Sequence, residues 1–323
     1  MVAAVRVHKT GGPEVLTYED VAIPAPGQGQ IKIKQHACGV NFIDCYFRNG
    51  SYPAPSMPFI AGNESAGKVI AVGPGVTDIK VGDRVAYVGP LGGYAAERVF
   101  AADRAVKLPD NISYEQAAGM MLKGMTVQYL LNRTFKVGKG TIVLIHAAAG
   151  GVGLIACQWA NHLGATVIGT VGSKDKAELA KKNGAHHTIL YRDEDFVAKV
   201  KEITSGKLCD VVYDGIGKDT FPASLDCLRP LGYFVSFGSA SGQIAAFNIN
   251  LLQAKGSLFA TRPTLNHYAA KREDLVSMAN DLFKVVGSGA VKIPTHTYAL
   301  KDAAQSHMDL EGRKTTGSVI LIP

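Results

Sequence analysis

The middle of the chain alternates short apolar runs with longer segments that mix apolar and polar residues. Short apolar runs bounded by glycine or polar residues are typical of buried strands. These runs predict strands at Thr141–Ile145, Ala165–Val171, Thr188–Tyr191, Asp210–Tyr213, Tyr233–Phe237 and Ser257–Thr261. Helices are expected in the first four gaps between them, at Leu154–Leu163, Lys176–Asn183, Glu194–Thr204 and Thr220–Cys227. This alternation predicts an α/β fold with a parallel sheet covered on both faces.

The pattern differs on either side of this region. Residues 1–120 contain short Val- and Ile-rich runs, proline–glycine turns and little helical periodicity, which favours a β-rich, barrel-like domain. After the sheet, apolar residues from Leu275 to Val286 follow one helical stripe. The final run, Ser318–Ile322, predicts another strand.

The turn from His146 to Gly153 carries the strongest chemical signal. It follows a predicted strand and opens a predicted helix, the context in which glycine-rich turns bind a pyrophosphate. Gly150 and Gly153 fit the last two glycines of G-x-G-x-x-G, and Ala148 stands where the first would be. We therefore expect Gly150, Gly151, Val152 and Gly153 to bind a dinucleotide; the alternative is a structural glycine turn.

The end of the next strand indicates which dinucleotide. An NAD site places an acidic residue there for the ribose 2′-hydroxyl. Here the chain reads Gly172-Ser173-Lys174-Asp175-Lys176, and Ser173 and Lys176 suit a 2′-phosphate. This favours NADP (NADPH) over NAD, although Asp175 argues against it and the lysines could form an ordinary solvated face.

Composition narrows the class further. The chain has 323 residues, enough for two domains, and 47% hydrophobic residues. We expect no membrane span, because no apolar stretch reaches the roughly 18 residues required, and no secretory signal at the N-terminus. Five scattered cysteines favour a reduced, cytoplasmic location. The net charge of +7 suits an anionic cofactor, and no dense basic run indicates specific nucleic-acid binding.

The chain resembles, over nearly its full length, the zinc-free quinone oxidoreductase branch of the medium-chain dehydrogenase/reductase superfamily, the group that includes zeta-crystallin. The segments that carry the resemblance are Gly39–Asp44, Gly62–Gly67, Ala147–Gly153, Val235–Gly238 and Gly317–Leu321. It implies a GroES-like catalytic domain, residues 1–122 and 263–323, split around a Rossmann NADP-binding domain, residues 123–262.

No metal is expected. The zinc branch needs Cys and His ligands, and its Gly-His-Glu motif is Gly62-Asn63-Glu64 here, with an amide that ligates zinc poorly. Cys38 lies near the first ligand position, but the region 86–97 lacks the cysteines of the structural zinc lobe. A metal-free enzyme should reduce acceptors that take hydride easily, such as quinones and electron-poor enones.

The resemblance also implies catalytic-site residues. Asn41 should face the nicotinamide half of the cofactor, with a turn-capping asparagine as the alternative. Tyr46 and Tyr52 flank the same loop and could line the acceptor site or donate a proton. Either tyrosine could equally be a packing aromatic, and solvent could supply the proton.

Further cofactor contacts are expected at strand ends, where such sheets bind ligands. Thr126 and Tyr129 are expected to begin the helix that enters the cofactor domain, although Tyr129 could be a core residue. Arg313 resembles a family position that reaches the cofactor, although its chemistry alone would suggest a surface cation. The candidates, besides the glycine turn and the ribose end, are Thr126, Tyr129, Tyr191, Gly215, Phe237, Gly238, Ser239, Phe259, Arg262 and Arg313.

These expectations converge on an NADPH-dependent quinone reductase that transfers hydride or single electrons. An NADPH-dependent enone or alkenal double-bond reductase is the nearest alternative. A zinc alcohol dehydrogenase and a non-catalytic NADPH-binding protein are more distant. A homodimer is usual in this group and could form through the strand Ser257–Thr261 as a free sheet edge.

Overall fold

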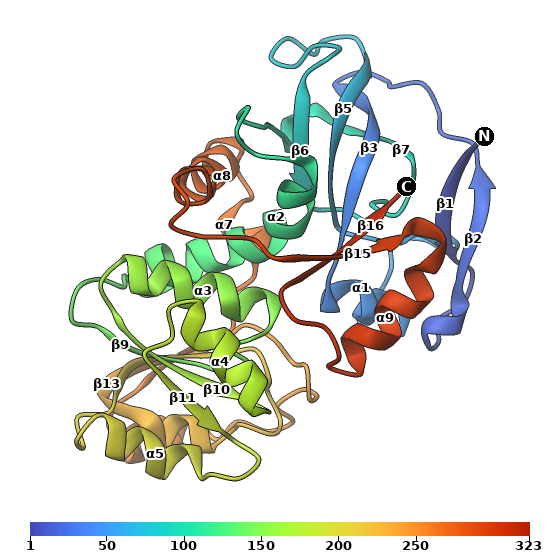
Figure 1. Cartoon of the computed structure of the whole chain (residues 1–323). Coiled ribbons are helices and arrows are strands. Elements are labelled where there is room, and N and C mark those ends of the chain that lie inside the picture. The colour runs from blue at the N-terminus through green and yellow to red at the C-terminus, as the bar shows by residue number, and fades with distance from the viewer. The chain divides into compact units, whose positions relative to one another are not determined.

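In the computed structural model, which describes residues 1–323, the chain divides into two units (Figure 1). The first comprises Met1–Met125, Ala269–Gly287 and Ile293–Pro323, and the second comprises Thr126–Tyr268 and Ser288–Lys292. The domain boundaries expected near residues 122 and 262 stay a prediction.

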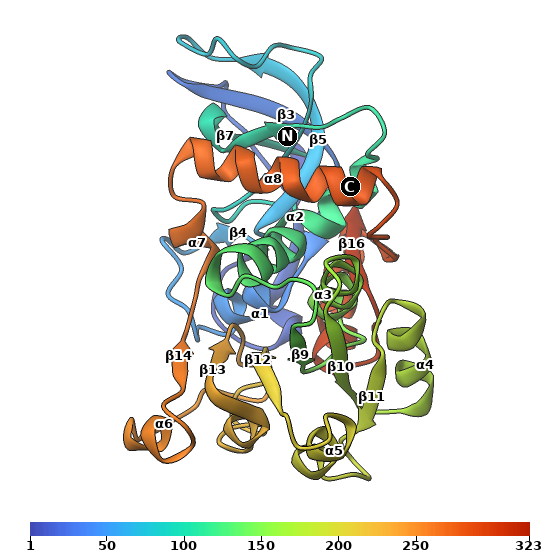
Figure 2. The same ribbon diagram turned by 90° about the vertical axis from the view of Figure 1, so that its left-hand side faces the viewer.

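The second unit is built on a six-stranded parallel sheet. The strand order is β11-β10-β9-β12-β13-β14, and Figure 2 shows β14 and β11 at its two edges. This is the order of a Rossmann fold, in which the strand order reverses between β9 and β12. The predicted parallel sheet is therefore confirmed. Its strands are β9 (Ile142–Ile145), β10 (Thr166–Val171), β11 (His187–Leu190), β12 (Cys209–Asp214), β13 (Leu228–Ser236) and β14 (Phe259–Thr261).

Helices cover both faces of this sheet. Figure 1 shows α3 (Gly151–His162) and α4 (Lys174–Lys182) on one side and α5 (Phe196–Ile203) on the other. The helix predicted at Thr220–Cys227 is wrong, because only a short 3-10 helix forms there. Pro222 has no N–H and disfavours helical geometry in the residue before it. The remaining helical segments of this unit are η3 (Leu130–Thr134), η4 (Ala223–Cys227), α6 (Asn250–Ala254) and α7 (Leu265–Tyr268).

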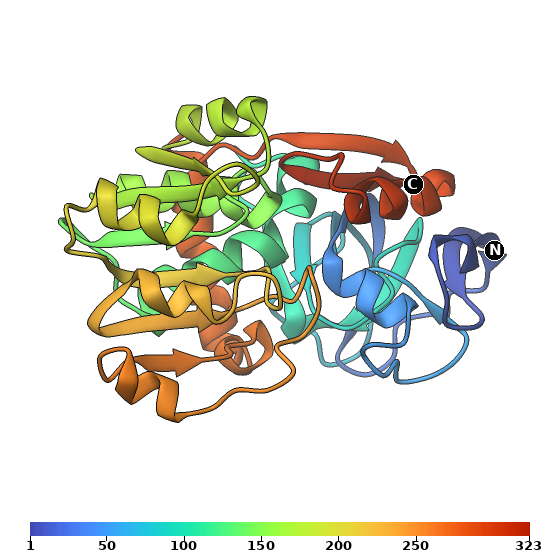
Figure 3. The ribbon, with the colours of Figure 1, turned by 90° about the horizontal axis from the view of Figure 1, so that it is seen from below.

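The first unit is rich in strands, as predicted. A seven-stranded sheet follows the path β15-β16-β3-β5-β6-β8, with β7 also paired to β3, and a smaller sheet has the order β2-β1-β4. β16 pairs antiparallel with β3, so the end of the chain lies beside its first third (Figures 1 and 3). The strands are β1 (Val2–Val7), β2 (Leu16–Val21), β3 (Gln30–Val40), β4 (Phe59–Ile60), β5 (Glu64–Val72), β6 (Arg84–Val88), β7 (Glu97–Ala101), β8 (Ala105–Lys107), β15 (Thr295–Ala299) and β16 (Ser318–Ile322).

The first unit also contains helices. In α8 (Arg272–Gly287) the buried residues are those of the predicted stripe. The expectation of little helix before residue 120 missed α1 (Phe42–Arg48) and the start of α2 (Tyr114–Tyr129), which ends in the second unit. The other helical segments are α9 (Ala303–Glu311), η1 (Pro13–Val15), η2 (Ala102–Arg104) and η5 (Leu300–Asp302).

Candidate active site

The glycine turn joins β9 to α3. Gly150 precedes the first helical residue with extended backbone, and Ala147 adopts a left-handed φ of 54°. A Cβ on Gly153 would lie 2.3 Å from the Ala147 carbonyl oxygen and 2.7 Å from the Ala148 carbonyl carbon. Only glycine therefore fits at position 153 while the turn stays closed against the helix.

This geometry suits a pyrophosphate. The N–H groups of Gly151 and Val152 lie in the first helical turn, so they have no partner within the helix. They lie at the positive end of the helix dipole, and both residues are only partly buried. The four predicted residues of the turn are thus gathered at one helix N-terminus, and they fit a dinucleotide phosphate.

The predicted ribose end is also gathered in one place. Ser173 caps α4, and its hydroxyl accepts a hydrogen bond from the Lys176 N–H at 3.4 Å. The Tyr191 hydroxyl lies 2.9 Å from where a Cβ of Gly172 would be. Asp175 is exposed in the first turn of α4 and does not end the strand. Hydroxyl groups, an ammonium group and a helix N-terminus suit a 2′-phosphate.

A third group of candidates lies at the carboxyl ends of β12 and β13. Arg262 donates hydrogen bonds to the Ser236 carbonyl (2.9 Å) and to the Ser239 hydroxyl (3.2 Å). The Phe237 ring lies 3.0 Å from where a Cβ of Gly215 would be. A Cβ on Gly238 would lie 2.5 Å from the Gly215 carbonyl oxygen. These residues lie at the carboxyl ends of the strands, where Rossmann folds bind ligands.

The structure does not bring Phe259 into this group. Phe259 is the first residue of β14, so it lies toward the amino end of that strand. Its ring stacks on Tyr233, with ring centroids 4.6 Å apart, and half of the residue is exposed. The carboxyl end of β14 leads instead into Arg262.

Thr126 and Tyr129 do not begin a helix. They lie in the last turn of α2, because the helix already starts at Tyr114. Tyr129 is buried and stacks on Tyr268 with ring centroids 4.5 Å apart. The Tyr268 hydroxyl in turn shares a hydrogen bond with Thr134 at 2.9 Å. Tyr129 is therefore held in the core of its unit.

His146 is the first residue of the glycine turn, and its buried side chain links the neighbouring strand ends. Sequence reasoning did not assign this role. Its ring nitrogens lie 2.9 Å from the Thr170 hydroxyl and 3.0 Å from the Ser224 hydroxyl, which donates to Asp214 at 3.1 Å. This chain ties together the ends of β9, β10 and β12. Burial lowers the pKa of His146, which keeps the imidazole neutral between its two hydroxyl partners.

Asn41 lies in the first unit, immediately before α1 and not in an open loop. The residue is buried, and its side-chain amide donates a 2.7 Å hydrogen bond to the fully buried Glu64. Glu64 also accepts from the Leu122 N–H at 2.6 Å and lies 3.4 Å from the Lys123 ammonium group. The Asn41 side chain is thus fixed by a buried acidic residue. An asparagine before an acidic residue three positions on is a helix-start signal that could have located α1.

Asp44 organises a second set of contacts that sequence reasoning missed. Its carboxylate accepts from the Asn41 N–H (2.9 Å), the Asn63 amide (2.6 Å) and the Tyr94 hydroxyl (2.9 Å). The Tyr94 hydroxyl also lies 3.0 Å from Nε2 of His307 on α9. No sequence spacing links these residues, because they come from four separate segments.

Tyr46 and Tyr52 are brought together, although Tyr46 lies within α1 and not beside a loop. Their ring centroids are 5.3 Å apart, and the Tyr52 N–H donates to the Tyr46 carbonyl at 2.9 Å. Both are half-buried, which leaves part of each ring accessible. Arg313 follows α9 and is exposed, with a left-handed φ of 58°.

The positions that resemble zinc ligands hold no suitable set of donors. The Asn63 amide donates to Asp44, Glu64 accepts from Asn41 and Leu122, and burial raises the pKa of the Cys38 thiol to about 12. Nowhere in the chain do three or more His, Cys, Asp or Glu side chains gather as a possible metal site. These residues therefore do not fit a zinc ion.

Two family patterns match the chain. Residues 27–110 match the alcohol dehydrogenase GroES-like domain, and residues 151–277 match the zinc-binding dehydrogenase domain. Together with the Rossmann sheet and the β-rich unit, these matches define the class of medium-chain dehydrogenases and reductases. The zinc in the second description has no matching donor set here.

Relatives that match the whole chain show which family within this class it belongs to. The chain is 51% identical over 315 residues to a quinone oxidoreductase of Pseudomonas aeruginosa, covering 97% of each chain. It is 48% identical to a 2-haloacrylate reductase of a Burkholderia species, over 100% of this chain and 99% of the relative. A crystal structure of Escherichia coli quinone oxidoreductase complexed with NADPH superimposes with a TM-score of 0.98 at 49% identity, covering 99% of this chain and 100% of the other. The chain belongs to the quinone oxidoreductase family.

Proposed function

We propose that this protein is an NADPH-dependent quinone reductase that works without a metal. The observation that carries the proposal is the intact glycine turn, with the space at Gly153 that only glycine can occupy, in a chain half identical to quinone oxidoreductases over its full length. An NADPH-complexed relative with the same fold supports the choice of cofactor.

The cofactor would be held at three places in the second unit. The N–H groups of Gly151, Val152 and Gly153 would bind the pyrophosphate, which the backbone of Gly150 can approach because it has no side chain. Ser173, Lys176 and Tyr191 would bind the 2′-phosphate. The third group is proposed to flank the nicotinamide half and consists of Gly215, Phe237, Gly238, Ser239 and Arg262. Thr126 and Tyr129, in the last turn of α2, are proposed to contact the same half of the cofactor. We retain Arg313 as a candidate contact. Phe259 is the weakest candidate, because it lies toward the amino end of its strand.

Bound NADPH supplies the reducing equivalents. The residues of the first unit are proposed to orient the reacting groups: Asn41 contacts the nicotinamide or its ribose through the amide that Glu64 fixes. Tyr46 and Tyr52 offer two partly accessible phenol rings that can stack on a planar acceptor. A phenol can also donate a proton to the reduced oxygen. The reaction then depends mainly on positioning.

A second candidate is reduction of an electron-poor carbon–carbon double bond. Its support is the 48% identity to a 2-haloacrylate reductase over the full length of this chain. Such an acceptor needs the same reduced cofactor and one proton, so the residues above would serve both reactions.

The test is side-by-side turnover with purified protein in metal-free buffer. NADPH and NADH oxidation would be measured with 1,4-benzoquinone, naphthoquinones, 2-alkenals and 2-haloacrylate. Fastest turnover with NADPH and quinones is expected. Faster use of alkenals or haloacrylate would select the second candidate. Cofactor binding with no turnover of any acceptor would indicate a non-catalytic NADPH-binding protein.

We also propose a homodimer formed at the edge strand β14. That strand is last in the sheet order, and Phe259 on it is half exposed, so an apolar edge is open to pairing. Sedimentation equilibrium is expected to show a dimer, and a monomer at the same concentration would contradict the proposal.

Residues 123–262 are proposed as the cofactor domain. The second unit, which spans nearly the same residues, supports this assignment. The five cysteines are all free and buried, which supports the cytoplasm as the location. No helix of the structure is long and apolar enough to cross a bilayer.

A further inference from the structure

A continuous chain of polar side chains, buried except for Glu311 at its end, runs through the first unit from Asn63 to Glu311. Its centre is Asp44, which is 1% exposed and accepts three hydrogen bonds. Two of the donors, the Asn41 N–H and the Tyr94 hydroxyl, share Oδ2, each at 2.9 Å. None of the three donors is a cation. Asp44 is therefore a buried carboxylate that is held by neutral groups alone.

The direction of the hydrogen bonds follows from Arg48. A guanidinium group only donates, so Nδ1 of His307, 3.0 Å from Arg48 Nη1, must accept. The ring proton is then on Nε2 and points to the Tyr94 oxygen at 3.0 Å. This leaves the phenol proton of Tyr94 for Asp44. The donors thus run in one direction, from Arg48 through His307 and Tyr94 to Asp44.

The far end of the chain is anchored on α9. Arg48 forms a paired salt bridge with Glu311 (2.8 and 3.1 Å), and α1 and α9 lie side by side in Figure 1. Burial, followed by the nearby Arg48, lowers the pKa of His307 to about 3. His307 is therefore neutral at neutral pH, and its tautomer is fixed.

A structural role alone does not explain a carboxylate at position 44. Burial raises the pKa of Asp44 to about 6, and the negative charge of Glu64 adds to this, against the hydrogen bonds from Asn63, Asn41 and Tyr94. The other titratable groups near it are the neutral thiol of Cys45 on the same helix and, beyond Tyr94, His307. An asparagine would have nearly the same shape without a charge to desolvate. What the carboxylate adds is acceptors on both oxygens, for Asn41 and Tyr94 on one and Asn63 on the other.

We propose that Asp44 is the positioning residue for Asn41, and that Tyr94 and His307 keep its carboxylate oriented. The proposal rests on the proposed function, which assigns Asn41 to the nicotinamide. When Asp44 gains a proton, a carboxyl O–H faces donors that need an acceptor, and the support of Asn41 is lost. Activity then falls on the acid side of about pH 6 because Asn41 moves, while the cofactor cradle of the second unit is unchanged.

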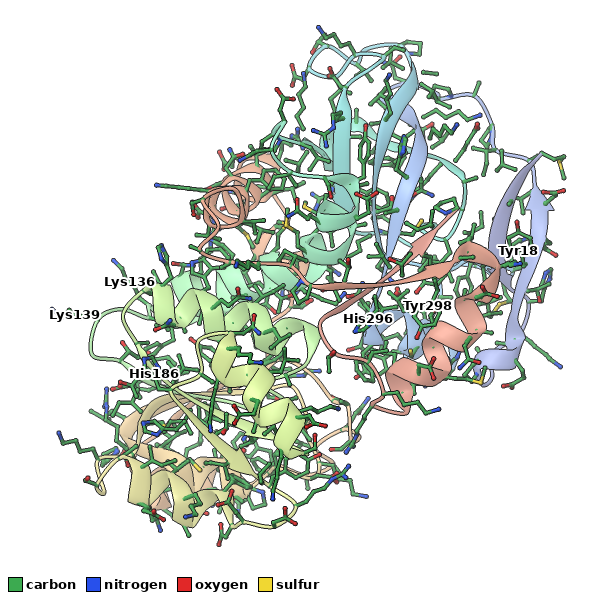
Figure 4. The ribbon with its side chains drawn as sticks, viewed as in Figure 1. Tyr18, Lys136, Lys139, His186, His296 and Tyr298 are labelled. Carbon is green, nitrogen blue, oxygen red and sulfur yellow. The ribbon has the colours of Figure 1, made fainter.

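The test compares Asp44→Asn and Tyr94→Phe with matched surface controls. Asp20→Asn and Tyr18→Phe make the same chemical changes on the exposed strand β2, where Figure 4 labels Tyr18. The readouts are kcat and KM for NADPH-dependent quinone reduction from pH 5 to 9, together with thermal unfolding. Asp44→Asn should lower kcat about 10- to 100-fold and abolish the acid limb while the protein stays folded. Tyr94→Phe should move the limb to higher pH, because a donor to the ionised carboxylate is lost.

The proposal is overturned if Asp44→Asn keeps both the wild-type kcat and the acid limb. If that variant does not fold, an unmoved limb in Tyr94→Phe overturns it equally. If the wild type reduces neither quinones nor activated alkenes, the proposed function fails on its own. The NADPH dissociation constant, followed by nicotinamide fluorescence, then decides: a pH dependence near 6 that Asp44→Asn removes supports the inference, and identical titrations overturn it.

Discussion

Replacing Gly153 with alanine is the most direct test of the cofactor cradle. The new methyl group would lie 2.3 Å from the Ala147 carbonyl oxygen and 2.7 and 2.8 Å from two backbone atoms of Ala148. Carbon atoms in contact normally approach to about 3.5 Å. All three obstacles are backbone, so rotating a side chain cannot relieve them. The turn must therefore move by roughly 1 Å away from α3.

The size of the effect follows from hydrogen-bond geometry. A shift of this size stretches an N–H···phosphate contact from about 2.9 Å beyond the range of a hydrogen bond. A hydrogen bond to a charged group contributes about 1.5–3 kcal/mol, so losing one weakens NADPH binding roughly 10- to 100-fold. Overpacking should also lower the free energy of unfolding by about 1–3 kcal/mol.

The assay is the KM for NADPH at saturating quinone, with the dissociation constant from nicotinamide fluorescence as a second readout. Gly138→Ala is the control. Gly138 belongs to the same unit, and nothing lies within 4 Å of the position that its Cβ would take. A Gly153→Ala protein that folds and binds NADPH as tightly as the control would refute the assignment of this turn to the pyrophosphate.

Three further outcomes are expected. Lys176→Glu should raise the KM for NADPH about tenfold or more and leave the KM for NADH nearly unchanged, because only NADPH has a 2′-phosphate to repel; the ratio of the two KM values is the measurement. Tyr52→Phe should lower kcat about tenfold or more if its phenol donates the proton, and an unchanged kcat would assign the proton to solvent or Tyr46. The pKa of Asp44 rises from 3.8 to about 6 on folding, so the folded state holds an extra proton between these values. Stability should therefore fall by about 3 kcal/mol as the pH rises through that window. Urea unfolding at pH 4 and pH 7 would show this fall in the wild type and its absence in Asp44→Asn.

The second unit was the more predictable part of the fold. Its strands are buried on both faces, so they appear in the sequence as continuous apolar runs with glycine turns between them. The predicted strand at Ala165–Val171 and the observed β10 differ by one residue. Composition favoured a helix at Thr220–Cys227, but Pro222 lacks a backbone donor, and only a short 3-10 helix forms after it.

The first unit was less predictable, because its order depends on contacts between distant segments. Nothing in the spacing of residues 1–120 shows that β16, at residues 318–322, pairs with β3. The chain from Asp44 to His307 joins residues more than 200 positions apart in sequence, and its members are ordinary polar residues when each is seen alone. The helix-start pattern at Asn41 was present in the sequence, and it would have placed Tyr46 within α1, where the prediction had it beside a loop.

Asn63 stands where the zinc branch has histidine, and in this structure it has a role of its own as a hydrogen-bond donor. In the zinc branch the residue at this position would hold an ion through a lone pair. Here the Asn63 amide uses a proton instead, which it donates to Asp44 at 2.6 Å. Glu64 next to it accepts from the Asn41 amide at 2.7 Å. Asn63 and Glu64, at the beginning of β5, therefore fix Asp44 and Asn41 respectively. The segment that would bind a metal in the zinc branch therefore organises the Asn41 site by hydrogen bonds in this protein. A histidine at position 63 would lose the amide donor to Asp44. It would not gain the thiolate that a zinc ion needs as a second ligand, because Cys38 is buried with its thiol protonated.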